Sequence, residues 1–506
     1  MRKFTTIALF LLATSGIISA EELNYTDELG IGYLLNTDTK TAAVSTSNPI
    51  ESSVVIPSSI TYGYEGNVAT YTVSSIGQDA FSNCYELQSV TLPNSIVSIE
   101  MGAFRGCSSL NSIDLSNSLK SIESDAFDGC SSLQSIDLPE SLNYLGPAFA
   151  SCGLKTITIP NGITELLPLT FANCPYLESV TIPNTMKTIG YAFEGCSSFS
   201  IVNVLDIATW CGMTFMGDFR PTRDGMHLYL NGTEVFDLVI PSSVEVISQE
   251  VFSEFNWIKT VDISDSVTTI GEQAFYNCTG LESVKFGTGL QSIGDNAFGY
   301  CENLTSVSLP SALKDLGEYT FTYCTSLESI TLPDSVEVIP EAFMRGCESL
   351  TTLTIPSNVT KIEQSAFSRT ENLTTVYFPA KLKSVGSLSF EESAIKDAYC
   401  DALVPPTCAT GSYATFSDTR LGNSTLHVPV GTKEAYAKAD QWKLFGNIVE
   451  GSDANGIESL ESDAEKCFDI IDLKGRILKH NATIEDLNSL DSDIYIINGE
   501  KKFIKR

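Results

Sequence analysis

Apolar and polar positions repeat along the chain with a period of about 23 residues. One full unit carries its apolar and turn residues in the order Ala80, Phe81, Cys84, Leu87, Val90, Leu92, Pro93, Ser95, Ile96 and Ile99. Thirteen phenylalanines mark the units: Phe81, Phe104, Phe127, Phe149, Phe171, Phe193, Phe252, Phe275, Phe298, Phe321, Phe343, Phe367 and Phe390. Their spacing is 22 to 24 residues, except for 59 residues between Phe193 and Phe252. This regularity is typical of a solenoid in which each repeat forms one layer.

Each unit contains one short strand followed by a turn. Val90 and Leu92 lie two residues apart, the period of a strand with one buried face. Pro93 has no N–H to continue a ladder, so it ends the strand. Stacked units therefore predict one continuous parallel sheet, with short helical or 3₁₀ turns opposite it between Ile99 and Ala103. The repeat phenylalanines are expected in the core.

The cysteines follow the same register. Ten of the 14 lie three or four residues after a repeat phenylalanine: Cys84, Cys107, Cys130, Cys152, Cys174, Cys196, Cys278, Cys301, Cys324 and Cys347. Each would have two equal neighbours in a solenoid, so nothing specifies pairs, and we favour buried free thiols over disulfides. Cys400 and Cys408 form either a local disulfide or two more buried thiols.

The repeat unit resembles that of the BspA-like leucine-rich repeat surface proteins over about residues 71–395. The shared features are Ala-Phe, the cysteine, Leu-x-x-Val-x-Leu-Pro and Ser-Ile. The resemblance implies a right-handed leucine-rich repeat solenoid of thirteen repeats on a bacterial cell surface, with adhesion as its usual role and no catalytic residues to transfer. The chain departs from commoner leucine-rich repeats where those carry an asparagine file. It has Ser95, Ser118, Ser141 and Gly162 there.

Segments outside the regular repeats complete the domain organisation. We expect an N-terminal cap over residues 21–70, a long repeat over 194–251 and a C-terminal cap over 396–450. A polar linker over 451–466 leads to a last segment, 467–506, that alternates like a small β-module.

Both ends of the chain carry features of export. Residues 1–20 resemble a secretory signal peptide, with Arg2 and Lys3 before the apolar run Ile7 to Leu12. Residues 467–506 resemble a type A C-terminal sorting domain of the type IX secretion system, through Asp-Leu-x-Gly-Arg and Ile-Tyr-Ile-x-x-Gly. The departure is Asp493, where such domains usually have glycine. The resemblance implies export to the outer cell surface through the type IX secretion machinery.

The composition excludes several classes of function. The 506 residues hold 62 Asp+Glu and 30 Lys+Arg, a formal net charge of −32, which argues against nucleic-acid binding. Only 3 histidines are present, far apart in sequence, and no nucleophile motif, phosphate loop or zinc pattern occurs. The sequence therefore predicts no cofactor, no metal site and no catalytic residue.

Two regions supply candidate ligand-binding residues. The outward positions of the predicted sheet are mostly hydroxylic, with added acids, and the candidates there are Asp114, Asp137, Thr158 and Thr181. The long repeat adds Trp210 and Phe215, because aromatic residues are common in binding patches. Each set also has a plainer interpretation: hydroxyl files suit strands, and aromatic residues fill an irregular layer.

These observations predict a non-catalytic, secreted or cell-surface protein that binds host matrix proteins, other cell-surface proteins or glycans. The alternative is a secreted carbohydrate-active or proteolytic enzyme on a repeat scaffold. An enzyme needs a concave site with convergent ionisable side chains, which separates the two hypotheses.

Overall fold

A computed structural model describes residues 22–27, 30–47, 51–64, 67–216, 225–451, 468–471, 477–482, 493–497 and 500–504. The predicted signal peptide, the linker beyond Gly451 and the Asp-Leu-x-Gly-Arg motif lie outside these residues. The chain divides into two compact units. Unit 1 holds residues 1–236 and 251–257, and unit 2 holds residues 237–250 and 258–506.

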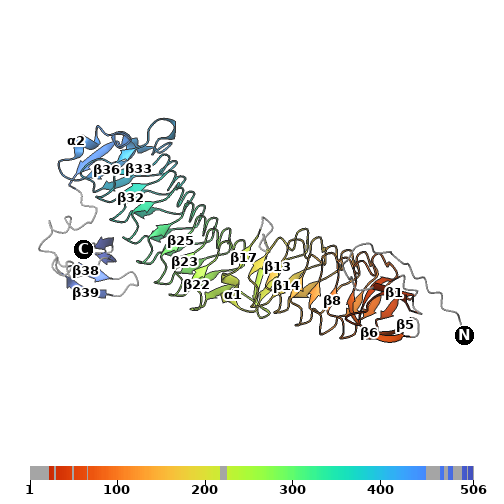
Figure 1. The fold of residues 1–506 in the computed structure, drawn as a ribbon. Coiled ribbons are helices and arrows are strands. Elements are labelled where there is room, and N and C mark those ends of the chain that lie inside the picture. Colours follow the sequence, from red (N-terminus) through yellow and green to blue (C-terminus); the bar gives the residue numbers. More distant parts are fainter. Residues whose placement is uncertain are drawn as a thin grey trace. The chain divides into compact units, whose positions relative to one another are not determined.

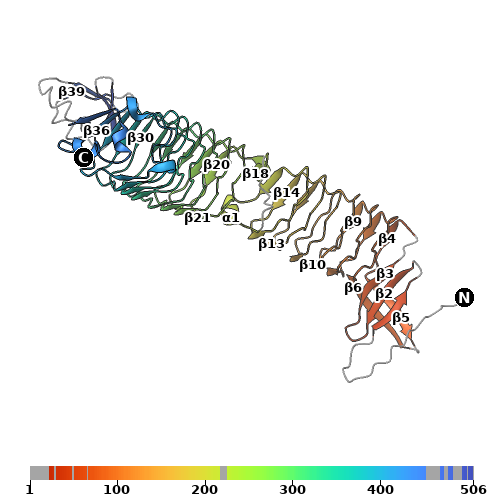
Figure 2. The ribbon, with the colours of Figure 1, turned by 90° about the horizontal axis from the view of Figure 1, so that it is seen from above.

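Both units are parallel β-solenoids, with about 16 turns in total and little helix, which confirms the predicted fold class. The successive turns of unit 2 run from green to blue in Figure 1, and those of unit 1 lie side by side in Figure 2. Each regular turn has three sides: an outer strand, a second short strand, and a turn that carries the repeat phenylalanine.

The outer strands come from the Leu-x-x-Val-x-Leu segments and form the outer sheet of each unit. In unit 1 they are β4 (Ser53–Val55), β7 (Ser89–Thr91), β9 (Ser112–Asp114), β12 (Thr156–Thr158), β14 (Ser179–Ile182), β16 (Ile201–Val204), β18 (His227–Leu230) and β19 (Thr233–Glu234). In unit 2 they are β20 (Asp237–Ile240), β22 (Thr260–Ile263), β24 (Ser283–Lys285), β26 (Ser306–Ser308), β28 (Ser329–Thr331), β30 (Thr352–Thr354), β32 (Thr375–Phe378), β34 (Asp397–Cys400), β36 (Thr425–Val428) and β37 (Asn447–Glu450). Apart from the antiparallel pair β18–β19, they pair in parallel.

The second side is a ladder of two-residue strands, most of them from the Ser-Ile segments. Unit 1 contributes β8 (Ser98–Ile99), β10 (Ser121–Ile122), β11 (Tyr144–Leu145), β13 (Glu165–Leu166), β15 (Thr188–Ile189) and β17 (Thr214–Phe215). Unit 2 contributes β21 (Val246–Ile247), β23 (Thr269–Ile270), β25 (Ser292–Ile293), β27 (Asp315–Leu316), β29 (Val338–Ile339), β31 (Lys361–Ile362), β33 (Ser384–Val385) and β35 (Thr407–Cys408).

The third side is not helical, contrary to the prediction of helical or 3₁₀ turns. The Phe81 N–H donates to the Ala103 carbonyl of the next layer at 2.7 Å, and alternate residues continue this ladder. In most turns the residues two before and two after the phenylalanine have positive φ, such as Asp79 (54°) and Asn83 (60°). Left-handed residues alternating with right-handed ones cannot propagate a helix, so the backbone bonds to the next layer instead.

Short irregular elements lie at the ends and in the long repeat. An N-terminal sheet holds β1 (Glu22–Thr26), β2 (Ile31–Asn36), β3 (Thr41–Ser47), β5 (Ser59–Tyr64) and β6 (Asn67–Ile76), and β6 pairs with β8. The long repeat contains α1 (Ile207–Cys211). Unit 2 contains η1 (Gly411–Tyr413), η2 (Leu421–Asn423), α2 (Lys433–Tyr436) and η3 (Trp442–Leu444). None of the described helices is long and apolar enough to cross a membrane.

The repeat phenylalanines form stacks through the core. All thirteen are at most 8 % exposed, which confirms their predicted burial. In unit 1, rings from Phe81 to Phe193 stack with centroids 5.1–5.6 Å apart. One member is out of register: Phe343 takes the place that alanine has in other turns, and Met344 takes the phenylalanine place. The Phe343 ring therefore meets Phe321 edge-on, at an interplanar angle of 83°.

The cysteines form a ladder of free thiols, in agreement with the favoured interpretation. In eight of them Sγ donates to the carbonyl of the phenylalanine one layer back, as from Cys107 to Phe81 at 3.0 Å and from Cys324 to Phe298 at 3.2 Å. Burial raises the pKa of Cys107 and of Cys324 to about 12, so both stay protonated at neutral pH. Cys400 and Cys408 are also free thiols.

The prediction of one continuous sheet is wrong. In unit 1 the outer sheet stops after β9 and resumes at β12, and residues 135–137 form no strand. This break falls among repeats of 22 residues, where a missing residue shifts the N–H and C=O groups of one layer against the next. In unit 2 the sheet breaks between β28 and β30, beside the misplaced Phe343.

The C-terminal segment forms its own antiparallel sheet. Its strands are β38 (Phe468–Ile471), β39 (Ile477–Ala482), β40 (Asp493–Ile497) and β41 (Glu500–Ile504), in the order β39-β38-β40-β41.

Candidate functional site

The outward side chains of the outer sheet form a mostly hydroxylic face in each unit. Strand residues alternate between the two faces, so the central Val90 of β7 is 2 % exposed and its neighbours point to solvent. In the middle of unit 2 the outward residues are all serine or threonine, namely Ser306, Ser308, Ser329, Thr331, Thr352 and Thr354.

Four predicted residues lie in this face of unit 1. Asp114 ends β9 and is exposed, whereas Asp137 is exposed but lies outside any strand, in the break of the sheet. Thr158 and Thr181 are direct partners on β12 and β14. The Asn203 side chain donates to Thr181 Oγ1 at 3.2 Å, so that hydroxyl is engaged inside the protein. The structure thus brings the two threonines together, and Asp114 faces Thr91 instead.

The two predicted residues of the long repeat differ in how deeply they are buried. Trp210 lies in α1 and is fully buried, with its Nε1–H donating to the Val251 carbonyl at 2.7 Å. The structure therefore places Trp210 in the core, away from any surface that a ligand could contact. Phe215, in β17, is half-buried and meets the Trp210 ring edge-on at 5.5 Å. Phe236, in the long repeat, and Trp257, just beyond it, are exposed aromatic residues, and Trp257 stacks on His227 at 5.0 Å.

Sequence reasoning missed a row of aromatic rings in unit 2, which we call the aromatic file. It consists of Tyr377, Tyr399 and His427, which occupy the outward position that holds Ser308, Thr331 and Thr354 in earlier turns. The rings stack at 4.7 Å and 4.3 Å, close to the strand spacing. Three half-buried rings in register give this part of the face a rigid apolar strip.

Asp397 lies beside the aromatic file. Its carboxylate is 3.4 Å from His427 Nε2. Burial, the Tyr399 phenol and Asp397 raise the pKa of Tyr377, and burial and Asp397 raise that of Tyr399. Both phenols therefore remain protonated at neutral pH and act as hydrogen-bond donors.

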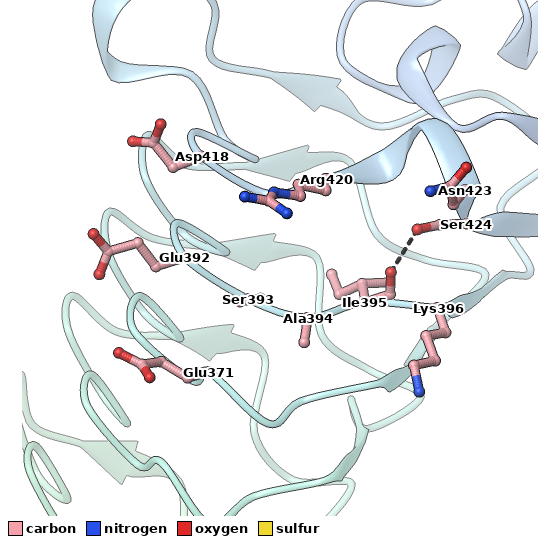
Figure 3. A pocket seen from close by; sticks show the side chains of 10 residues that line it. All are labelled: Glu371, Glu392, Ser393, Ala394, Ile395, Lys396, Asp418, Arg420, Asn423 and Ser424. Atoms are coloured by element: carbon pink, nitrogen blue, oxygen red, sulfur yellow. Dashed lines mark hydrogen bonds between the residues drawn. The ribbon is translucent and has the colours of Figure 1, made fainter.

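A hollow of about 540 Å³ adjoins the start of the strands that carry the aromatic file. It is lined by Glu371, Glu392, Ser393, Ala394, Ile395, Lys396, Asp418, Arg420, Asn423 and Ser424. Three carboxylates, Glu371, Glu392 and Asp418, lie one above another on one side (Figure 3). The Arg420 side chain points toward that column, and Lys396 lies on the other side (Figure 3).

The hollow results from unequal turn lengths. Asp397 of β34 follows Phe390 by seven residues, whereas Thr375 follows Phe367 by eight. In the next turn, Thr425 follows Phe416 by nine. The short segment 393–395 therefore lies recessed between two longer segments. The segment before Thr425 bonds to the recessed one where Ser424 Oγ donates to the Ile395 carbonyl at 2.5 Å.

The hollow carries charges of both signs. Glu392 contacts Arg369 Nε at 3.5 Å, outside the lining. Within the described residues, the side chains of Glu371, Lys396 and Arg420 form no hydrogen bond or ion pair. All five charged lining residues are exposed to solvent. Among all the residues that the structure describes, no group of three or more His, Cys, Asp and Glu is arranged to hold a metal.

The sequence contains signals for both features. The change from threonine to Tyr377, Tyr399 and His427 at one repeat position is readable once the strand register is known. The hollow depends on comparing turn lengths that differ by one residue. Phe416 extends the phenylalanine stack, but its spacing of 26 residues from Phe390 breaks the period and hid this last layer.

Comparison with known protein families assigns the chain to one of them. The BspA type leucine-rich repeat region matches in six copies, over residues 66–178, 165–215, 226–347 and 291–421, more than half of the chain. The chain belongs to the BspA-type leucine-rich repeat family. This family of surface proteins typically mediates protein–protein interactions, and its members are generally non-enzymatic scaffolds.

Solved structures of other leucine-rich repeat proteins are similar to this BspA-type chain. A leucine-rich repeat protein from Bacteroides ovatus ATCC 8483 is 25% identical, with a TM-score of 0.52, over 87% of this chain and 100% of that chain. A leucine rich cell surface protein from Faecalibacterium prausnitzii A2-165 is 24% identical, with a TM-score of 0.34, over 73% and 92%. The pneumococcal vaccine antigen PcpA is 19% identical, with a TM-score of 0.36, over 86% and 98%. No curated protein matches the chain.

Proposed function

We propose that this protein is a non-catalytic binding protein of the bacterial cell surface that captures a protein partner through the outer face of its solenoid. The supporting observation is the change of that face in unit 2, where a hydroxylic file gives way to a rigid aromatic file beside a charged hollow. Aromatic residues and arginine are enriched where proteins bind each other.

The hollow also bears on the enzyme alternative, because it brings ionisable side chains together. All five of its charged residues are exposed to water, and none is enclosed in an apolar site. General acid–base catalysis relies on groups whose proton affinity is tuned by burial and close neighbours. Exposed charges of both signs fit recognition of a polar partner better than proton transfer.

A binding assay tests this proposal directly. The mature chain is immobilised, and host matrix proteins are titrated over it at several salt concentrations. We expect saturable binding that weakens about thirtyfold or more when Tyr399→Ala and Arg420→Gln are combined, because hot-spot side chains each contribute about 1 kcal/mol or more. Asp38→Lys, an exposed change in the turn between β2 and β3, is the control and leaves binding unchanged. Hydrolysis of a matrix protein, abolished by Glu371→Gln, would contradict the proposal.

Export is the second part of the proposal. The resemblances at both ends support secretion by a signal peptide, followed by type IX sorting through residues 467–506. Removing residues 467–506 from the expressed chain should leave the protein folded but inside the outer membrane. Protease treatment of intact cells measures this. A truncated chain that is still degraded from outside would show that the segment is not a sorting domain.

A further inference from the structure

The hollow of unit 2 has the features of a site for one kind of partner segment. It offers carboxylates along one side and two basic side chains opposite, and three of these five charges have no partner among the described residues. A purely cationic ligand would meet Arg420 and Lys396, and a purely anionic one would meet Glu371 and Asp418. Only a ligand that carries both charges close together satisfies both sides.

The position of the hollow adds a third requirement. Lys396 directly precedes β34, and Tyr399 is the third residue of that strand. At about 3.3 Å per residue, the aromatic file therefore begins about 10 Å from Lys396. An extended ligand seated in the hollow would reach the aromatic file after about three residues. The Tyr377 and Tyr399 phenols add hydrogen-bond donors there.

We infer that the hollow and the aromatic file together bind an exposed peptide segment of a protein partner in which adjacent basic and acidic residues are followed, about three residues later, by an aromatic residue. This inference rests on the proposed function and names the recognition element within it. The basic side chain lies against Glu371, Glu392 and Asp418, and the acidic one against Arg420 and Lys396. The aromatic side chain packs on Tyr399.

Capped, fluorescently labelled peptides test the inference by anisotropy against the full mature chain. The main probe is Lys-Asp-Gly-Gly-Trp. Three others replace the charged pair by Gln-Asn, by Lys-Lys or by Asp-Asp, and a fourth replaces Trp by Ala. We expect saturable binding of the main probe and binding about fivefold to tenfold weaker for every other peptide, since each exposed ion pair contributes modestly. Equal binding of the Lys-Lys peptide would overturn the requirement for both charges.

Matched variants locate the site. Lys396→Gln with Arg420→Gln removes one side, and Glu371→Gln with Asp418→Asn removes the other. Each pair should weaken the main probe about fivefold to tenfold. Glu302→Gln is the control. Glu302 follows Phe298 by four residues, as Glu371 follows Phe367, but lies three layers before the hollow, so this substitution should leave binding within twofold. Insertion of one glycine after Ala394 fills the recess while keeping every charge, and should weaken binding at least as much. Unchanged binding in these variants would overturn the inference.

Two further results distinguish a failure of this inference from a failure of the proposed function. If matrix proteins bind the hollow variants as tightly as the original chain, the hollow inference fails and the proposed function stands. If the main probe binds but no protein partner does, the proposed function fails. Free lysine, itself a zwitterion, is the small-molecule competitor. Displacement of the probe at an equal concentration of free lysine would show an amino-acid site and overturn the peptide inference.

Discussion

Two turns of the molecule, one in each unit, are shorter by one residue at the same place, but only one of them borders a hollow. Cys152-Gly153-Leu154 in unit 1 and Ser393-Ala394-Ile395 in unit 2 are both one residue shorter than the usual segment between the core residues. A Cβ at Gly153 would lie 2.2 Å from the Ser131 carbonyl oxygen, so the shortened segment rests directly on the layer before it. Ala394 instead lies exposed at the edge of the hollow.

The next layer decides between the two outcomes. In the turn after Gly153, Ser179 follows Phe171 by the usual eight residues, whereas Thr425 follows Phe416 by nine. A shortened segment beside ordinary neighbours packs down, and a shortened segment beside a lengthened one leaves a recess. In a stacked fold, a site can therefore arise from two length changes of one residue without any new element.

The largest effect is expected from adding a side chain to each short segment. Gly153→Val should destabilise unit 1 by about 1–3 kcal/mol, because its Cβ meets backbone that cannot rotate away. Ala394→Val should change the stability of unit 2 by no more than about 0.5 kcal/mol, since its side chain enters open space. Urea unfolding followed by circular dichroism measures both. Equal losses would show that the two segments are packed alike.

A smaller effect is expected at the first residue of each short segment. Cys152 Sγ donates to the Phe127 carbonyl at 3.1 Å, and the Ser393 hydroxyl pairs with that of Thr370 at 3.0 Å. Cys152→Ala removes a fully buried sulfur and should cost about 2 kcal/mol. Ser393→Ala loses one hydrogen bond and should cost about 1 kcal/mol. The same unfolding measurement applies, and a larger loss at Ser393 would reverse the comparison.

The smallest structural change is a thiol placed at the exposed segment. Burial raises the pKa of Cys152 well above its usual range, so almost no thiolate exists there at pH 8. The A394C thiol is exposed and should titrate near the ordinary value of about 8.5. Iodoacetamide at pH 8 should therefore label the variant within minutes and Cys152 only after unfolding. Mass spectrometry of peptide fragments distinguishes them. Fast labelling of Cys152 in the native chain would show that this layer opens.

The regular part of the fold was predictable from the sequence because its period is set by local chemistry. One phenylalanine, one thiol and one short apolar strand recur in most layers, and in those layers each occupies the same place in the turn. The repeat pattern gave the wrong register where either of two neighbouring apolar residues could occupy the phenylalanine position. Phe343 and Met344 are both apolar, and only the backbone shows that Met344 occupies the core position.

The site was less predictable because it depends on neighbouring layers. Trp210 has the composition of a binding residue, yet its indole N–H finds a backbone acceptor in the core. The charged residues of the hollow come from three different turns, and only the differing turn lengths bring them around one recess. Asp114 and Thr158 do lie at the predicted face, which shows that strand alternation fixes exposure but not function.

The thiol ladder has a consequence for how such an array changes its length. Each thiol–carbonyl bond joins residues 25 or 26 apart, so it always spans one boundary between layers. A duplication of one repeat brings a new donor and a new acceptor together, and a deletion removes one of each. The remaining layers then re-form the same bond with their new neighbours. The array is therefore able to grow or shrink by whole repeats without leaving an unmatched thiol, which gives evolution a simple way to alter the extent of its surface.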